Sequence, residues 1–125
     1  MVPGGARVTV ANPSRAKGTG YENKVLGRLV RIFGSGVSRS AAGTESNDFH
    51  GVPFPVECKK RKTLEVPKWV RCIRKVSESS AWAIFVEDGD CRRASTFGEV
   101  MIVDAGFGEE LLQAAMTLAQ LENDE

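Results

Sequence analysis

The sequence is poor in the residues that build most zinc and redox sites. Its 125 residues include one histidine, His50, and three cysteines, Cys58, Cys72 and Cys91, with no Cys-x-x-Cys pair. A single histidine and three scattered cysteines do not complete a zinc site. We therefore expect the cysteines to be reduced thiols in a cytosolic protein.

Long hydrophobic runs are also missing. No apolar run has membrane-spanning length, and residues 1–17 contain no apolar segment of the kind that a signal peptide requires. We expect a cytoplasmic protein with no membrane partner. The length suits one domain, and an apolar content of 42% is ordinary for a globular chain.

Basic residues are scarce in the C-terminal part and acidic residues are scarce before it. Residues 1–75 hold 15 Lys and Arg against 5 acidic residues, a balance of +10, whereas residues 76–125 hold 2 against 11, a balance of −9. The chain is electrically polarised, and its basic part suits a polyanion such as nucleic acid.

Composition divides the chain into three segments. Residues 1–17, rich in Gly, Pro and Ser, are expected to be a flexible basic arm, which either touches phosphates or has no function. Residues 18–121 are expected to form the single domain, and residues 122–125 an acidic tail.

Hydrophobic periodicity predicts an α/β (α+β) chain with a central mixed sheet of about five strands flanked by helices. Helical spacing of apolar residues is found at 20–33, 66–77 and 108–121, whereas strand patterns are found at 35–40, 54–59, 81–86, 91–96 and 100–103. Trp69 and Val76 belong to the predicted buried side of the second helix. The last helix is expected either to cover the sheet or to pair with a second copy.

One strand carries the residues with the clearest chemical meaning. Phe54, Val56 and Cys58 alternate with Pro55, Glu57 and Lys59, so Glu57 and Lys59 share the face opposite the core. A turn through Gly51 and Pro53 could lay Asp48 beside Glu57. Two carboxylates that close together need a cation to neutralise them.

The pattern Asp48 … Glu57-Cys58-Lys59 resembles the core of the PD-(D/E)xK nuclease superfamily, with Asn47 in place of the usual proline. The order of helix, strand, Arg39, small-residue loop, Asp48 and Glu-x-Lys is similar to that of archaeal and phage Holliday-junction resolvases. The resemblance covers about residues 18–104. It implies a restriction-endonuclease-like core and a Mg²⁺-dependent endodeoxyribonuclease, with Mn²⁺ as a substitute.

The resemblance also assigns roles to residues. Asp48, Glu57 and the Cys58 backbone carbonyl would be metal ligands, Glu22 would act directly or through water, and Lys59 would orient or deprotonate the attacking water. The residues expected to contact DNA are Arg28, Arg39, Ser40, Thr44, Ser46, Lys60, Arg61, Lys62 and Lys68. The alternative for Glu22 is an interaction with the start of the first helix.

The substrate stays open at this stage. A resolvase-like protein would be a homodimer that cuts four-way DNA junctions. The alternatives are a repair, maturation or restriction-like endonuclease on other DNA, or a non-catalytic nucleic-acid-binding module.

Overall fold

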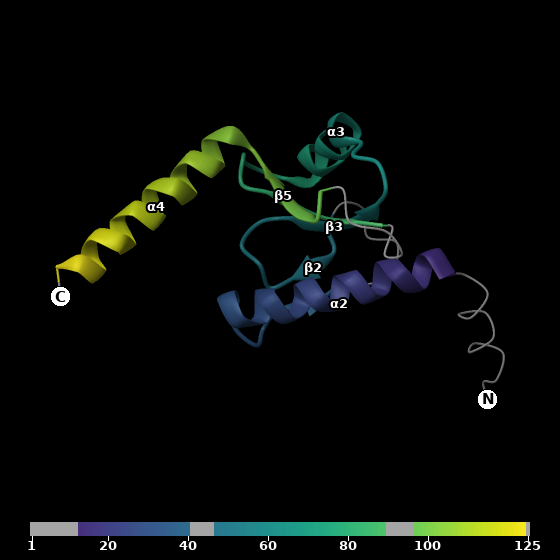
Figure 1. Ribbon diagram of the computed structural model, residues 1–125, viewed down its shortest axis with the longest axis horizontal. Helices are drawn as coiled ribbons and strands as arrows, with labels where there is room; N and C mark the ends of the chain where they lie inside the picture. Colours follow the sequence, from purple (N-terminus) through teal and green to yellow (C-terminus); the bar gives the residue numbers. More distant parts are fainter. Residues whose placement is uncertain (1–12, 41–46, 90–96, 125) are drawn as a thin grey trace.

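The computed structural model describes residues 13–40, 47–89 and 97–124 (Figure 1). These residues form a mixed α/β structure of three helices and five strands. The elements are α2 (Pro13–Phe33), β1 (Ser38–Arg39), β2 (Phe49–His50), β3 (Val56–Arg61), α3 (Val66–Val76), β4 (Ala83–Asp88), β5 (Glu99–Val103) and α4 (Ala105–Asn123).

The strands form two sheets, one antiparallel and one mixed, and not the single central sheet of about five strands that the sequence predicted. Strands β1 and β2 pair antiparallel, while β3 pairs parallel with β4 and β4 pairs antiparallel with β5. Helix α3 provides the crossover that a parallel pair requires. Asp48 connects the two sheets, because its amide donates to Val56 O at 2.8 Å and its carbonyl accepts from Ser40 N at 2.8 Å.

The three-stranded sheet has a hydrophobic cluster on each face. Helix α2 and the β1–β2 hairpin cover one face, and α3 covers the other, as Figure 1 shows. The first cluster contains Tyr21, Val25, Leu29, Val37, Phe49, Val56 and Ala83. The second contains Trp69, Ile73, Trp82, Ile84 and Val86. Alternation along β4 explains the division, since Ala83 and Ile84 project to opposite faces.

Glycine at position 51 fixes the return of the chain after β2. Gly51 has φ of +85°, in the left-handed region that favours glycine. A Cβ at this position would also collide with the carbonyl of Gly36. The backbone of the β1–β2 hairpin therefore packs closely here, and this places Asp48 against β3.

Helix α4 extends away from the rest of the protein (Figure 1). Asp104 caps its start by accepting hydrogen bonds from Gly106 N at 2.9 Å and Phe107 N at 3.3 Å. None of its residues is buried. The expectation that this helix covers the sheet is therefore wrong. Across the described parts of the chain, no helix has both the length and the apolar character needed to cross a bilayer.

Several element boundaries differ from the sequence expectation. Helix α2 begins at Pro13 rather than Gly20, so residues 13–17, expected in the arm, are helical. Gly18 and Gly20 are poor helix formers, which is why the sequence favoured a later start. Strand β4 covers Ala83–Asp88, two residues later at each end than the strand expected at 81–86. Val76 is 41% exposed instead of buried. Residues 1–12, and the strand expected at 91–96, lie outside the described residues.

The fully buried Ile84 of β4 gives a direct test of this packing. We expect Ile84→Ala to lower the free energy of unfolding by about 2–5 kcal/mol, because the lost side chain leaves a cavity. Met101→Ala on the neighbouring strand is the control: its side chain is 53% exposed, so the loss should stay below about 1 kcal/mol. Urea denaturation of both variants measures the difference, and equal losses would contradict the assigned faces.

Candidate functional site

Asp48 lies against β3 at the edge away from β4. Its Oδ2 accepts a hydrogen bond from the amide of Cys58 at 2.7 Å, and its own amide donates to Val56 O. The backbone of Glu57 lies between these two contacts. The sequence predicted that a short hairpin would lay Asp48 beside Glu57, and the hydrogen bonds place it there.

Glu57 and Lys59 share one face of β3, as alternation predicted. Their register partners on β4 are Ile84 and Val86, which belong to the cluster under α3. Glu57 is 5% exposed, and its Oε1 forms an ion pair with Lys59 Nζ. Lys59 Nζ also lies 5.9 Å from the ring centroid of Trp69, near the outer limit of a cation–π interaction.

Cys58 projects to the opposite face, as expected. Its side chain packs against the cluster under α2, and burial raises the pKa of its thiol well above the ordinary value. The amide of Cys58 points toward Asp48. In an extended strand the amide and carbonyl of one residue point to the same edge, so the Cys58 carbonyl also faces the Asp48 edge.

Glu22 approaches from α2, on the other face of the sheet from Glu57. Its Oε1 accepts from Arg39 Nη2 at 2.8 Å and Nε at 3.2 Å. Because α2 begins at Pro13, Glu22 lies in the middle of the helix. The alternative in which Glu22 interacts with the helix start is therefore wrong.

Among the residues that the structure describes, three buried side-chain oxygens around Asp48 have no hydrogen-bond partner: Ser40 Oγ, Asn47 Oδ1 and Glu57 Oε2. Asn47 precedes Asp48 in the chain, Ser40 donates its amide to the Asp48 carbonyl, and Glu57 lies beside Asp48 on β3. Buried polar atoms without partners are costly, and they commonly mark a site for water, an ion or a ligand.

The carboxyl of Asp48 has a shifted pKa. Its pKa is raised to about 6, first by burial and then by the negative charges of Glu22 and Glu57. The hydrogen bond from the Cys58 amide and the positive charge of Lys59 act in the opposite direction. Asp48 therefore lies within electrostatic reach of both other acids.

The three acids do not form one cluster. Among the residues that the structure describes, no three His, Cys, Asp or Glu side chains are close enough to hold one metal ion. The Asp48 carboxylate lies at the β3 edge and Glu57 projects from the face under α3, whereas the carboxylate of Glu22 is bound by Arg39. A metal ion at Asp48 and Glu57 would need backbone carbonyls and waters as its other ligands.

The basic residues predicted to contact DNA fall into two groups. Arg28 and Lys60 are bound within the protein, Arg28 to Glu99 at 2.7 Å and Lys60 to Glu87 at 2.5 Å. The exposed residues are Arg61, Lys62 and Lys68. Arg39 is engaged by Glu22, and the predicted residues Thr44 and Ser46 lie outside the described residues.

Sequence reasoning missed the polar contacts between α2 and the sheet. Glu99 accepts from Tyr21 at 2.6 Å and from Arg28, which holds the pKa of this carboxyl below its usual range. Although burial opposes it, hydrogen bonds from Lys24 and Lys60 lower the pKa of Glu87. Extending the alternation of Ala83 by two steps would have placed Glu87 on this face.

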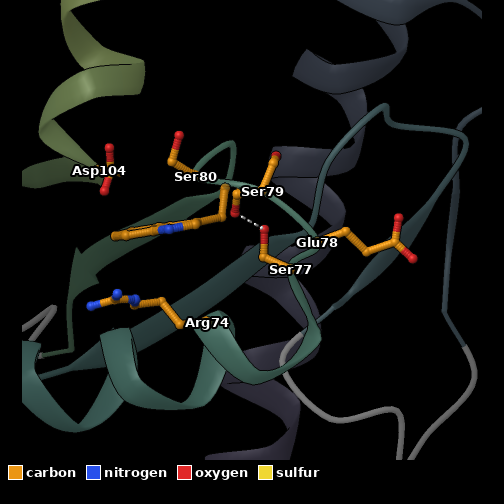
Figure 2. Close-up of a pocket in the computed structure, with 7 residues that line it drawn as sticks. Arg74, Ser77, Glu78, Ser79, Ser80 and Asp104 are labelled. Atoms are coloured by element: carbon orange, nitrogen blue, oxygen red, sulfur yellow. Dashed lines mark hydrogen bonds between the residues drawn. The ribbon is translucent and has the colours of Figure 1, made fainter.

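Two hollows lie away from these acids, along the loop between α3 and β4. One, of about 260 Å³, is lined by Arg74, Ser77, Glu78, Ser79, Ser80, Trp82 and Asp104 (Figure 2). The other, of about 480 Å³, shares Ser77, Glu78 and Ser79 and reaches Asn47. Neither is lined by Asp48, Glu57 or Lys59, so these residues lie outside both hollows.

The raised pKa of Asp48 is measurable by carboxyl-detected NMR titration. We expect an apparent pKa of about 6 for Asp48, falling in Glu57→Gln because a neighbouring negative charge is lost. Since the folded-state pKa exceeds the unfolded value of about 3.8, the protein should lose stability as pH rises from about 4 to about 6.

Replacing Asp48 with Asn should remove that loss, which amounts to at most about 3 kcal/mol. The exposed Glu78→Gln serves as the control and should keep the pH dependence. If the pKa of Asp48 is near 4 and is the same in the wild type and in Glu57→Gln, this electrostatic account is contradicted.

Comparison of the chain with protein-family models, with curated proteins and with solved structures gave no match. The likeness to nucleases therefore depends on Asp48, Glu57 and Lys59 and on the order of the elements around them.

Proposed function

We propose that the protein is a Mg²⁺-dependent DNA endonuclease with a restriction-endonuclease-like core of the PD-(D/E)xK type. The observation that carries the proposal is the half-buried carboxylate of Asp48 next to the buried carboxylate of Glu57 on β3. Asp48 has a raised pKa, and among the described residues one buried oxygen of Glu57 has no hydrogen-bond partner. A carboxyl with a shifted pKa beside a second acid is a candidate functional site, because shifted pKa values are common at such sites.

The donor set fits a hard divalent cation. Mg²⁺ prefers carboxylate, carbonyl and water oxygens, and it is commonly held by one or two carboxylates together with waters. Asp48 and Glu57 would hold it with the Cys58 carbonyl, which faces the same edge, and Glu22 would contribute through water. When bound, Mg²⁺ would lower the pKa of water and neutralise charge on the phosphate that is cut.

The remaining chemistry belongs to side chains of the chain itself. Lys59 Nζ lies on the face of Glu57, where it can orient the attacking water and donate to a phosphate oxygen. Trp69 limits the positions that Lys59 can take, since the ammonium lies over its ring. Arg39 donates a hydrogen bond to the carboxylate of Glu22 and so restricts the positions from which Glu22 could bind a water of the site.

The substrate follows from charge. The exposed Arg61, Lys62 and Lys68 suit the backbone phosphates of a nucleic acid. We propose DNA, with four-way junctions as the preferred form on the resemblance to resolvases and other DNA as the alternative.

A second candidate is a nucleic-acid-binding module without catalysis. Its support is that Glu57 is paired with Lys59 and Glu22 with Arg39, so the protein's own bases neutralise two of the acids. Such a module would bind DNA equally well with EDTA, and its affinity would fall smoothly as salt rises.

Cleavage of matched four-way, flap, nicked and linear DNAs tests the proposal. We expect cutting only with Mg²⁺ or Mn²⁺, and a loss of more than about 100-fold in Glu57→Gln with binding retained, since that variant removes a ligand charge. Glu78→Gln, an exposed change elsewhere, should cut at the wild-type rate. Normal cutting by Glu57→Gln would refute the site, whereas equal cutting of all four DNAs would refute only the junction preference.

Metal binding has a readout that is independent of cleavage. We expect saturating Mg²⁺ to raise the unfolding temperature, because a ligand that binds the folded state stabilises it, and to lower the apparent pKa of Asp48 below about 6. Glu57→Gln should weaken both effects, and Asp48→Asn combined with Glu57→Gln should abolish the rise in unfolding temperature. Calorimetry and NMR with and without Mg²⁺ provide the measurements, and an unchanged Asp48 titration would exclude this residue as a ligand.

A further inference from the structure

Helix α3 has a strongly basic outer face. Four of its eleven residues are Lys or Arg, and none is acidic. Lys68, Arg71 and Lys75 follow one another at intervals of three and four residues, so they lie within an arc of about 60° on one side of the helix. All three residues are exposed. We call these three residues the basic stripe. The fourth base, Arg74, lines the hollow of Figure 2.

The basic stripe faces away from the core. The buried residues of α3, Trp69 and Ile73, lie about 150° round the helix from the centre of the stripe and belong to the cluster on the sheet. Because the apolar side of α3 is already occupied, the helix cannot insert it into a lipid surface, as interfacial helices do. Within Val66–Val76, which the structure describes in full, the only aromatic residue is the buried Trp69. The stripe therefore offers no ring on which the bases of a single-stranded nucleic acid could stack.

The basic stripe has no counter-charge in the part of the chain that the structure describes. The bases that form ion pairs with glutamates there are Lys24, Arg28, Arg39, Lys59 and Lys60. No residue of the stripe is among them. The stripe thus differs from the bases that the protein neutralises itself, and its charges are available to an anion from outside.

Helix stability does not explain the basic stripe. Like charges three or four residues apart repel each other and destabilise a helix. Lys68 lies in the first turn, where a positive charge opposes the helix dipole, and only Lys75 has the favourable position in the last turn. The stripe therefore destabilises α3 in the free protein, and a polyanion that contacts all three residues would offset the repulsion.

The basic stripe lies on the side of the sheet that carries the proposed site. Helix α3 covers the sheet face from which Lys59 projects, and α2 covers the other face (Figure 1). The ammonium of Lys59 lies 5.9 Å from the ring centroid of Trp69, the residue next to Lys68. The exposed Arg61 ends β3, and the exposed Lys62 follows it on the way to α3. A polyanion bound along the stripe would therefore be held next to the proposed site.

We propose that the basic stripe, together with Arg61 and Lys62, binds the phosphate backbone of duplex DNA and holds it against the proposed site. The choice of DNA as the polyanion rests on the proposed function. Along the helix axis the stripe extends about 10 Å, a length that about three successive phosphates of one DNA strand occupy. The stripe adds Arg71 and Lys75 to the residues expected to contact DNA. Phosphate contacts of this kind position the duplex without reading its base sequence.

The salt dependence of DNA binding tests the proposal. Binding of a linear duplex is measured by fluorescence anisotropy in EDTA between about 50 and about 200 mM salt. The logarithm of the association constant falls linearly with the logarithm of the salt concentration, and each phosphate contact contributes about 0.9 to the steepness. We expect Arg71→Gln to reduce the steepness by about 0.9 and to weaken binding about tenfold near 0.1 M salt. Arg71→Lys, which keeps the charge, should keep the wild-type steepness.

Arg31→Gln is the matched control. Arg31 is exposed in the last turn of α2, the helix that covers the other face of the sheet, and its loss changes the net charge by the same amount. This variant should bind DNA with the wild-type steepness. Glutamine is a good helix former, so both variants should fold, which circular dichroism verifies. An unchanged steepness in Arg71→Gln, or an equal change in Arg31→Gln, would overturn the proposal.

Two further probes test the kind of partner. The duplex should bind more tightly than a single strand of the same length, and vesicles that contain phosphatidylserine should show no binding that depends on Arg71. Preference for the single strand, or Arg71-dependent binding to the vesicles, would overturn duplex DNA as the partner.

This surface and the proposed hydrolysis can fail separately, because the binding measurements are made in EDTA. Duplex DNA that binds through Arg71 but is never cut with Mg²⁺ would refute the nuclease alone. Mg²⁺-dependent cutting by a protein in which Arg71→Gln binds DNA with the wild-type steepness would refute this surface alone.

Discussion

The three hydrogen bonds of Asp48 hold the functional part of this protein together. Its amide donates to Val56, its carbonyl accepts from Ser40, and its carboxylate accepts from the Cys58 amide. The first two join the β1–β2 hairpin to the three-stranded sheet. The third holds a carboxylate against a strand edge, where burial raises its pKa to about 6. The two backbone hydrogen bonds therefore fix the fold, and burial of the carboxyl, against the effect of the third hydrogen bond, raises its pKa.

Acids and bases on either side of the sheet are arranged differently. On the α2 side, Glu87 and Glu99 each accept hydrogen bonds from two side chains, and the pKa of both carboxyls is lowered. Around Asp48 the balance is opposite, since the neighbouring acids outweigh the single ammonium of Lys59. This contrast sets Asp48 apart from the acids that are paired on the α2 side, and it is the physical basis for proposing Asp48 as a site residue.

The sequence predicted local features better than long-range ones. Alternation along β3 correctly put Glu57 and Lys59 on one face and Cys58 on the other, because strand geometry depends on neighbouring residues alone. The position of Glu22 could not be derived in this way. Its pairing with Arg39 depends on how α2 crosses β1, and two glycines concealed the first turns of that helix.

Helix α4 is a second example of a local feature that was predicted and a long-range contact that was not. Its apolar spacing predicted a helix correctly, but periodicity cannot tell whether an apolar face meets the sheet or another chain. The attachment through Phe107 and Phe54, which sends the helix away from the sheet, appears only in three dimensions.

The central claim is that Asp48 and Glu57 bind one divalent cation between them. Anomalous diffraction from crystals soaked in Mn²⁺ tests it most directly, because the scattering locates the metal without reference to any activity. The account predicts a peak in contact with both carboxylates and with the Cys58 carbonyl, and a Glu57 oxygen that has gained a partner. A peak elsewhere, or none, with the Glu57–Lys59 pair unchanged, would contradict it.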